Sequence, residues 1–203
     1  MYWAPALYFQ HADGTYEFVE QVGGMLAYYF LFKDDNNPSA GVKAFPEGFR
    51  MIAGDSLRRN YSIAGLDVKQ ADPEKSLWVA LGQTSQVDLE QRAVGFNCLN
   101  YGRHPEGSLY RHYLPDKAYL DANCADGVRI ELMFPSCWNG KDLDSPNHRD
   151  HVAYPDLVMN GRCPPGFNVK LPGLFYETIW ATNAFVGKEG QFVLANGDIN
   201  GTY

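Results

Sequence analysis

The sequence lacks the features that identify several large classes of protein. It has no stretch of about 18 consecutive apolar residues, which excludes a membrane-spanning helix. It has no run of Lys or Arg, and its 17 basic residues are outnumbered by 24 acidic ones, for a formal net charge of -7. Nucleic acid and anionic lipid both attract basic surfaces, so the composition argues against either as a partner.

Short catalytic and cofactor motifs are also missing. The sequence contains no G-x-S-x-G, no H-E-x-x-H, no phosphate-binding P-loop and no G-x-G-x-x-G. These absences argue against a hydrolase with a nucleophile elbow, a zinc protease with that helix motif, a P-loop nucleotidase and a Rossmann dehydrogenase. No cofactor is required by the sequence.

Cysteine is scarce and widely spaced. There are four cysteines and no C-x-x-C, so the usual spacing of a structural zinc site is absent. Four cysteines allow two disulfides in three pairings, and four buried free thiols are the alternative reading. Two N-x-[ST] sequons, at Asn60 and Asn200, are candidate glycosylation sites and favour the secreted, disulfide-bonded reading. The candidate disulfide cysteines are Cys98, Cys124, Cys137 and Cys163.

Aromatic residues and turn formers are abundant instead. Aromatics make up 14% of the chain, and 20 Gly and 12 Pro leave little room for long helices. Tyr, Phe and Trp favour strands, and alternating hydrophobicity dominates the chain. We therefore expect an all-β fold, a β-sandwich or jelly roll with long disulfide-supported loops, forming a single domain over residues 1–203.

The strands can be placed along the chain. Residues 3–9 and 15–20 flank Asp13-Gly14, which predicts a hairpin with a type I′ turn. The continuous apolar run over residues 25–32 predicts a buried strand. Further strands are expected over residues 48–53, 77–81, 128–134, 174–180 and 191–195, and one short helix over 87–94.

A long loop over residues 135–173 concentrates polar chemistry. His148 and His151 are three residues apart, a spacing that on a helical turn places both imidazoles on one side to move protons or hold a divalent metal. Asp142 or Asp144 can orient an imidazole or add a ligand. The alternative is that these side chains hydrogen-bond to the loop's own backbone.

Carboxylates on the predicted strands offer a second kind of chemistry. Glu131 and Glu177 both lie on strands, and two carboxylates at the right separation perform glycoside hydrolysis. We expect Glu131 to face solvent. Glu177 has apolar neighbours, so a raised pKa is conceivable for its carboxyl group. Asp198 follows an Asn-Gly pair and forms a turn in the simplest reading.

Four segments together resemble a known family. They are residues 45–55, the loop from Phe134 to Pro155, residues 174–180 and residues 196–198. They resemble the fungal secreted domain-of-unknown-function family DUF1996, and the similarity spans nearly the whole chain. The resemblance implies a fungal-wall or plant-polysaccharide context, because members often carry a WSC or cellulose-binding module.

The resemblance also shows what this chain does not contain. Family members usually have a His-x-His motif before the Tyr-Trp strand and a His-Gly-Asp-like segment after the Gly-Asp turn, and neither is present. No signal peptide is recognisable at the N-terminus either. We therefore expect a chain truncated at both ends, in which His148 and His151 belong to a larger histidine set.

These observations lead to three hypotheses about function. The first is a secreted carbohydrate-active enzyme, a hydrolase or lyase acting on polysaccharide, and the second is a non-catalytic wall-binding module. The third is a metal protein built on His148 and His151. The candidate catalytic residues are His148, His151, Asp142, Asp144, Lys141, Tyr154 and Glu177, and the candidate substrate-binding residues are Trp138, Asn139 and Asp198.

Overall fold

The computed structural model describes residues 2–63, 65–67 and 69–196. Its regular structure is mostly antiparallel sheet, which confirms the all-β prediction. The strands are β1 (Leu7–His11), β2 (Tyr16–Phe18), β3 (Gln21–Phe30), β4 (Val94–Cys98), β5 (Val128–Met133), β6 (Cys137–Trp138), β7 (Val152–Ala153), β8 (Val169–Lys170), β9 (Gly173–Trp180) and β10 (Gly190–Leu194). The helices are α1 (Gln86–Arg92) and α2 (Lys117–Asn123), with 3-10 turns at Pro38–Ala40, Lys75–Leu77 and Thr182–Phe185.

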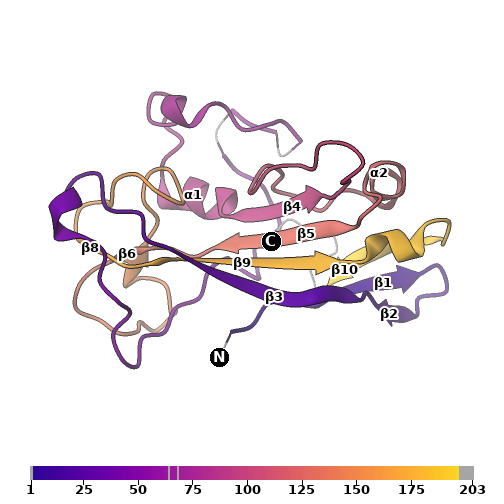
Figure 1. Ribbon diagram of the computed structural model, residues 1–203, viewed down its shortest axis with the longest axis horizontal. Helices are drawn as coiled ribbons and strands as arrows, with labels where there is room; N and C mark the ends of the chain where they lie inside the picture. The colour runs from indigo at the N-terminus through magenta and orange to yellow at the C-terminus, as the bar shows by residue number, and fades with distance from the viewer. Residues whose placement is uncertain (1, 64, 68, 197–203) are drawn as a thin grey trace.

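A four-stranded central sheet in the order β3-β9-β5-β4 forms the body of the domain (Figure 1). A second sheet, β10-β1-β2, lies at one end of it, and a third, β7-β6-β8, lies at the other. The main core joins the first two sheets, because Phe9 and Phe192 belong to the same buried cluster as Phe96 and Trp180. Two sheets therefore share one apolar interior.

The register of the central sheet separates two faces. Thr178 pairs with Ile130, and Tyr176 with Leu132, so these side chains share the face that turns toward the main core. Glu177 pairs with Glu131 on the opposite face. We call the face that carries Tyr176 and Thr178 the groove face, and the face that carries Glu131 and Glu177 the carboxylate face. The predicted alternation along residues 174–180 is thereby confirmed.

The predicted N-terminal hairpin forms, but with a different turn. β1 pairs with β2, and the Gly14 N–H donates to the His11 carbonyl over 2.9 Å. Gly14 has a φ of 85°, while Asp13 is not among the described residues of positive φ, so the turn is not type I′. The Asp13 carboxylate instead accepts from the Thr15 N–H over 2.9 Å, which stabilises a longer loop closed by the glycine.

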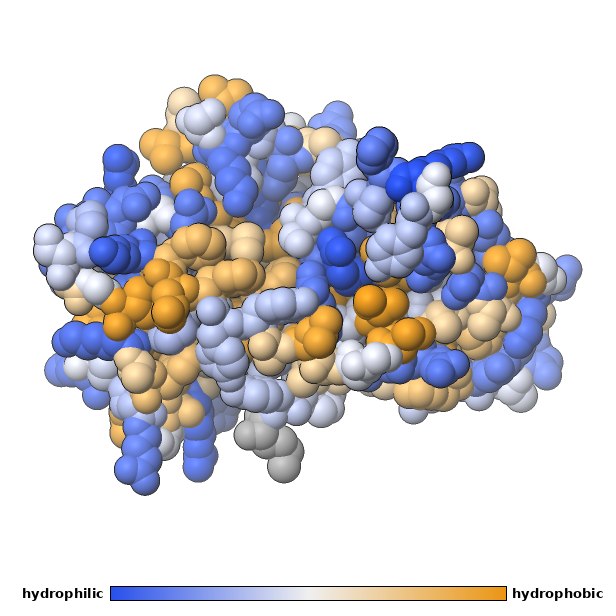
Figure 2. Space-filling model, viewed as in Figure 1, coloured by the Kyte–Doolittle hydropathy of each residue, from blue (hydrophilic) through white to orange (hydrophobic). Residues whose placement is uncertain are grey.

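The strand predicted as buried over residues 25–32 is present as β3, but it lies at the edge of the central sheet. Leu26, Tyr28 and Tyr29 are 46%, 40% and 48% exposed. Figure 2 shows apolar residues along the middle of the face that carries β3 and β9. A continuous apolar run predicts a strand whose two faces are both buried. Among the described strands β3 pairs only with β9, at the edge of the sheet, and its side chains stay partly exposed.

Two other predicted strands are wrong. Residues 48–53 form an irregular loop because their backbone bonds to another loop: the Arg50 N–H donates to the Leu143 carbonyl and the Ile52 N–H to the His148 carbonyl, each over 2.9 Å. Residues 77–81 form a 3-10 turn and tight turns, with local backbone bonds such as Leu81 N–H to Leu77 O.

The helix predicted over residues 87–94 is confirmed as α1. A reciprocal capping box between Ser85 and Asp88 begins it. Helix α2 and strand β4 were not predicted, although Asp116 provides a recognisable N-cap for α2, where its side chain accepts from the Tyr119 N–H. No helix among the described residues has the length and apolarity that a membrane span requires.

Two disulfides resolve the pairing that the sequence left open. Cys98 bonds to Cys124 and joins the end of β4 to the end of α2. Cys137 bonds to Cys163 and fixes the long loop, as its cysteines predicted. The loop is not structureless, because β6, β7 and β8 within it form the third sheet.

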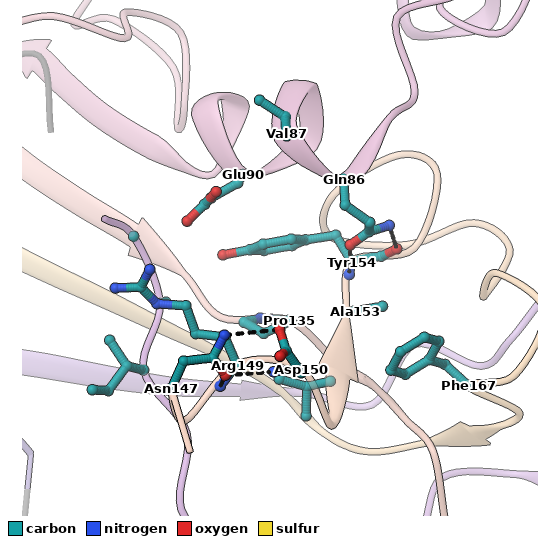
Figure 3. A pocket seen from close by; sticks show the side chains of 14 residues that line it. Gln86, Val87, Glu90, Pro135, Asn147, Arg149, Asp150, Ala153, Tyr154 and Phe167 are labelled. Carbon is teal, nitrogen blue, oxygen red and sulfur yellow. Dashed lines mark hydrogen bonds between the residues drawn. The ribbon is translucent and has the colours of Figure 1, made fainter. Parts of the chain in front are cut away.

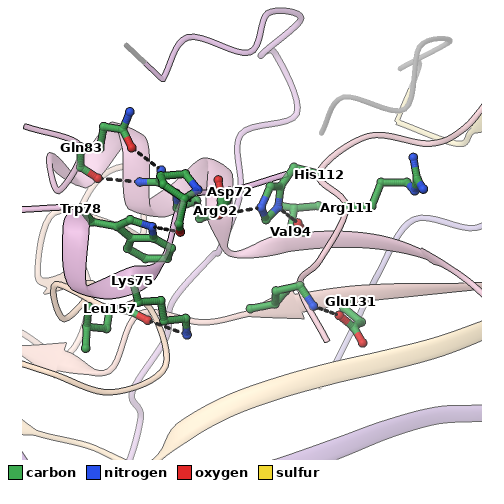
Figure 4. A network of polar contacts seen from close by, with 12 residues as sticks. Asp72, Lys75, Trp78, Gln83, Arg92, Val94, Arg111, His112, Glu131 and Leu157 are labelled. Carbon is green, nitrogen blue, oxygen red and sulfur yellow. Dashed lines mark hydrogen bonds and ion pairs between the residues drawn. The ribbon is translucent and has the colours of Figure 1, made fainter. Parts of the chain in front are cut away.

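A buried polar network fixes the segment before α1 (Figure 4). Arg92 is 1% exposed and donates to Asp72 Oδ2 over 3.0 Å and to the carbonyl and side-chain oxygens of Gln83 over 2.7 Å each. Its guanidinium carbon lies 4.0 Å from the ring centroid of Trp78. His112 adds a 3.2 Å contact from Nε2 to Asp72. One buried arginine thus connects α1 to residues 72–83.

Candidate functional site

A groove of about 760 Å³ lies on the groove face of the central sheet. Its floor includes Tyr176 and Thr178 of β9 and Ile130 of β5, and loop residues 45–56 and the N-terminal residues 2–5 form its walls. Eight aromatic residues belong to its lining: Tyr2, Trp3, Tyr29, Phe45, Phe49, Phe96, Phe134 and Tyr176.

The aromatic walls of the groove are held by contacts with its floor and with the long loop. The Tyr2 ring meets the Tyr176 ring edge-on at 5.6 Å, and the Tyr2 hydroxyl bonds to the Tyr29 hydroxyl. Phe49 packs edge-on against His151 at 5.2 Å. Trp3 remains 71% exposed at the rim. The groove therefore presents fixed aromatic surface to solvent.

A second cavity, of about 430 Å³, lies beyond one wall of this groove. Gln86 and Glu90 of α1 line one side, and Asn147, Asp150 and Tyr154 line the other (Figure 3). The two cavities share a wall made of residues 52–54 and Arg149. In Figure 3 the guanidinium of Arg149 extends toward the same end of the cavity as the Tyr154 hydroxyl and the Glu90 carboxylate.

The structure brings two of the predicted catalytic residues together. His148 Nδ1 donates to Asp144 Oδ1 over 2.6 Å, and the hydrogen bond from His148 lowers the pKa of Asp144. His148 has a φ of 58°, a conformation that residues other than glycine adopt rarely. Its side chain is 42% exposed and its ring lines neither cavity. The pair has the arrangement of an imidazole oriented by a carboxylate.

His151 does not join that pair. It is 1% exposed, Nε2 donates to the Arg50 carbonyl over 2.7 Å, and Nδ1 lies 3.0 Å from Ser145 Oγ. Both ring nitrogens are therefore engaged in holding the 45–56 loop against the long loop. No group of three or more His, Cys, Asp or Glu side chains suited to a metal occurs among the described residues.

Four other residues that the sequence predicted for the site take part in hydrogen bonds within the loop itself. Asn139 Oδ1 accepts from the N–H groups of Lys141 and Asp142 over 3.0 and 3.1 Å, and its Nδ2 donates to the Asp142 carboxylate over 2.8 Å. Trp138 Nε1 donates to the Asp142 carbonyl over 2.7 Å. These contacts match the alternative in which the polar side chains satisfy the loop's own backbone. The Lys141 side chain is exposed.

Tyr154 lines the second cavity but its hydroxyl is committed to the fold. It is 5% exposed and donates to the Met133 carbonyl over 2.8 Å. Burial raises the pKa of Tyr154 well above its ordinary value, so its hydroxyl keeps its proton. The Gln86 side chain holds the Tyr154 backbone with two hydrogen bonds. Its Oε1 accepts from the Tyr154 N–H over 2.7 Å, and its Nε2 donates to the Tyr154 carbonyl over 3.0 Å.

The two strand carboxylates meet on the carboxylate face, away from the groove. The expectation that Glu131 faces solvent is wrong, because it is 1% exposed. Its carboxylate accepts from Asn97 Nδ2 over 2.7 Å, from the Leu109 N–H over 2.6 Å and from Arg129 Nε over 2.5 Å. Burial, with a smaller contribution from Glu177, raises the pKa of Glu131 to about 7.

Glu177 is the accessible member of this pair. Its side chain is 15% exposed, and its Oε1 lies 3.6 Å from Arg129 Nε. A loop and three hydrogen-bond donors enclose the Glu131 carboxylate. A ligand can therefore reach Glu177 and Arg129 but not Glu131. A catalytic role of Glu177 stays a prediction. Gly95 belongs to this arrangement, because a Cβ there would lie 2.7 Å from Glu131 Oε2.

Some sequence candidates lie outside the described residues, and some structural features had no clear signal in the sequence. Asp198 and Asn200 lie outside the described residues, whereas Asn60 is exposed. The groove and Arg149 were missed because they arise from segments far apart in the chain. Lys170 is a buried cation whose Nζ donates to Ser136 Oγ over 2.7 Å, and burial lowers its pKa to about 8.

Comparisons with known proteins give one match. The family model described as "Domain of unknown function (DUF1996)" matches residues 1–203. No curated protein and no solved structure matches the chain significantly. The loop and strand motifs that suggested the family therefore lie in a chain matched from end to end, and the chain belongs to the DUF1996 family.

Proposed function

We propose that this domain binds a polysaccharide chain in the aromatic groove on the groove face of the central sheet. The observation that carries the proposal is the aromatic lining of a groove of about 760 Å³, a size within the range of ligand sites. Sugar rings present C–H groups on their faces, and these pack against aromatic rings with little loss of hydration of the hydroxyls.

The groove also offers polar groups at the margins of its aromatic surface. Arg50, Asp55, Thr178 and Asn196 line it beside the rings. A few polar groups around an apolar surface fix a ligand's orientation, which a polysaccharide requires because its ring edges carry hydroxyls. The aromatic-rich composition of the chain supports the same choice of partner.

The proposal includes an extracellular setting. Two disulfides join distant parts of the chain, and disulfides persist in oxidising compartments. Cell-wall or plant polysaccharide is available outside the cell. Secretion and glycosylation at Asn60 are parts of this proposal, and intact-mass measurement of the protein from its native host tests both.

Replacing Trp3 with alanine should weaken binding to the preferred polysaccharide about tenfold, because loss of one stacking ring costs about 1.4 kcal/mol. Binding to a panel of insoluble and soluble polysaccharides by pull-down and calorimetry measures the effect. The Trp3→Ala/Tyr29→Ala double variant should bind more weakly still.

Tyr101→Ala is the matched control, since Tyr101 is 66% exposed and lines neither cavity. It should bind like the unaltered protein. The binding proposal is rejected if no polysaccharide in the panel binds, or if the Trp3 and Tyr101 variants lose affinity equally.

A second candidate function is cleavage of the polysaccharide, and the His148–Asp144 pair favours it. The carboxylate fixes Nδ1 as the protonated nitrogen, which leaves Nε2 to act as a general base. Nε2 makes no hydrogen bond to the described residues, and the side chain is 42% exposed.

His148→Ala should then reduce turnover at least about 100-fold, with Asp144→Asn reducing it less, because a general base contributes roughly 10²–10⁴-fold. Reducing ends report hydrolysis, and absorbance of unsaturated products reports lyase activity. His104→Ala, at another exposed histidine, is the control. Turnover that persists in His148→Ala would exclude this role, and binding without turnover leaves the domain a binding module.

A further inference from the structure

The wall between the two cavities contains an arginine whose guanidinium is not saturated. Arg149 lines both cavities. Its backbone N–H donates to Ser145 Oγ over 3.0 Å and to Asn147 Oδ1 over 3.1 Å, so the root of the side chain is fixed. The Nε atom is buried and has no hydrogen-bond partner among the described residues.

The nearest carboxylate is too far away to satisfy this guanidinium. Arg149 Nη1 lies 3.9 Å from Asp55 Oδ1, which is beyond hydrogen-bond distance. The same Asp55 oxygen already accepts from the Leu57 N–H over 3.0 Å. Asp55 is therefore committed to its own turn and attracts Arg149 only at long range.

Three other arginines with largely buried side chains are paired closely with carboxylates. Arg58 lies 2.6 Å from Glu90, and Arg92 lies 3.0 Å from Asp72. Arg129 lies 2.5 Å from Glu131. Against these, Arg149 stands out as a partly buried cation that keeps donors for another acceptor. A buried N–H without a partner costs free energy that a suitable ligand restores.

Two arginines line the groove of a chain that is acidic overall. Arg50 and Arg149 line it together with Asp55, whereas the chain carries a formal charge of -7. Glu131 also borders the groove, but its carboxylate is on the opposite face of the sheet, held by Arg129. The carboxylates of Glu90 and Asp150 line the second cavity and not the groove.

A ligand that satisfies both parts of this site has a ring face for the aromatics and a planar anion for the guanidinium. A carboxylate matches the fork of an arginine in two parallel hydrogen bonds, which a hydroxyl cannot do. We propose that the groove selects polysaccharides that contain uronic acid residues, and that Arg149 binds the sugar carboxylate. This inference rests on the proposed binding function and specifies its ligand.

The test compares polygalacturonate with its fully methyl-esterified form, which has the same backbone without the charge. At low salt the protein should bind the free acid at least about tenfold more tightly, since a charge-assisted pair is worth more than 1.4 kcal/mol. Arg149→Gln should abolish that difference, so that the variant binds the free acid no more tightly than the ester. Arg149→Lys should keep part of it, because the charge remains but the bidentate geometry does not.

Lys188→Gln is the matched control for charge. Lys188 is exposed in the loop before β10, where it pairs with Glu17 over 3.3 Å, so its loss changes net charge equally without touching the groove. It should retain the preference for the free acid. Thermal unfolding of each variant establishes that Arg149→Gln is folded.

The outcomes separate this inference from the binding function. Equal affinity for the acid and the ester, or an Arg149→Gln variant that still prefers the acid, overturns the uronate assignment while the groove remains a polysaccharide site. Binding of neutral glucans alone has the same meaning. Failure to bind any polysaccharide overturns both.

Discussion

Arg92→Met should lower the free energy of unfolding by about 3–5 kcal/mol, because it leaves a half-buried carboxylate and a buried amide without their main donor. Arg92 is 1% exposed and bonds to Asp72 and Gln83, and its guanidinium lies over Trp78. A loss of this size is a large part of the 5–15 kcal/mol that is typical of native domains. Urea unfolding followed by tryptophan fluorescence measures it.

The control for Arg92 is Arg103→Met, an exposed arginine whose replacement should change stability by no more than about 0.5 kcal/mol. The Arg92→Met/Asp72→Asn double variant should be less destabilised than the sum of the single changes, because removing the carboxylate removes the unpaired buried charge. A loss below about 1 kcal/mol for Arg92→Met would show that residues 72–83 are held by other contacts.

Stability should fall as the pH rises from 4.5 to about 7 by an amount on the order of 3 kcal/mol that is due to Glu131. Burial raises the pKa of Glu131 from 4.5 to about 7 in the folded chain. A carboxyl group with a raised pKa in the folded state stabilises the protein below its unfolded pKa. That stabilisation is lost as the pH passes through the folded value.

Glu131→Gln removes the ionisable group while keeping its shape, so this decline should be absent from the variant's stability curve and should appear as the difference between the two curves. Urea unfolding at half-unit steps from pH 4 to 8 records it. Glu177 raises the pKa of Glu131, so Glu177→Gln should lower that pKa and move the decline in stability to lower pH. Glu20→Gln, an exposed carboxylate, should leave the curve unchanged. A parallel curve for Glu131→Gln would contradict the assignment.

The long loop shows how far residue types alone identify a site. Its two histidines are equivalent in the sequence, yet His148 is exposed beside Asp144 while both nitrogens of His151 are engaged with Arg50 and Ser145. The difference arises because the 45–56 loop covers the side chain of His151, whereas its bond to His148 reaches only the backbone carbonyl. The spacing of the two histidines does not predict which side chain the distant 45–56 loop will cover.

The same limit applies to the carboxylates. Alternation placed Glu131 and Glu177 on strands, but strand order decided that they are neighbours, and the loop that carries Leu109 decided that Glu131 is closed to solvent. Arg149 had no signal in the sequence, since its importance depends on being left without a close partner between two cavities.

Local interactions made the all-β class, the N-terminal hairpin, helix α1 and the strands β5, β9 and β10 readable from the sequence alone. Alternation, turn residues and capping depend on neighbours in the chain. Tertiary structure alone decided the disulfide pairing, the exposure of β3 and the groove. These depend on strand order and on contacts between distant segments, which local patterns do not encode.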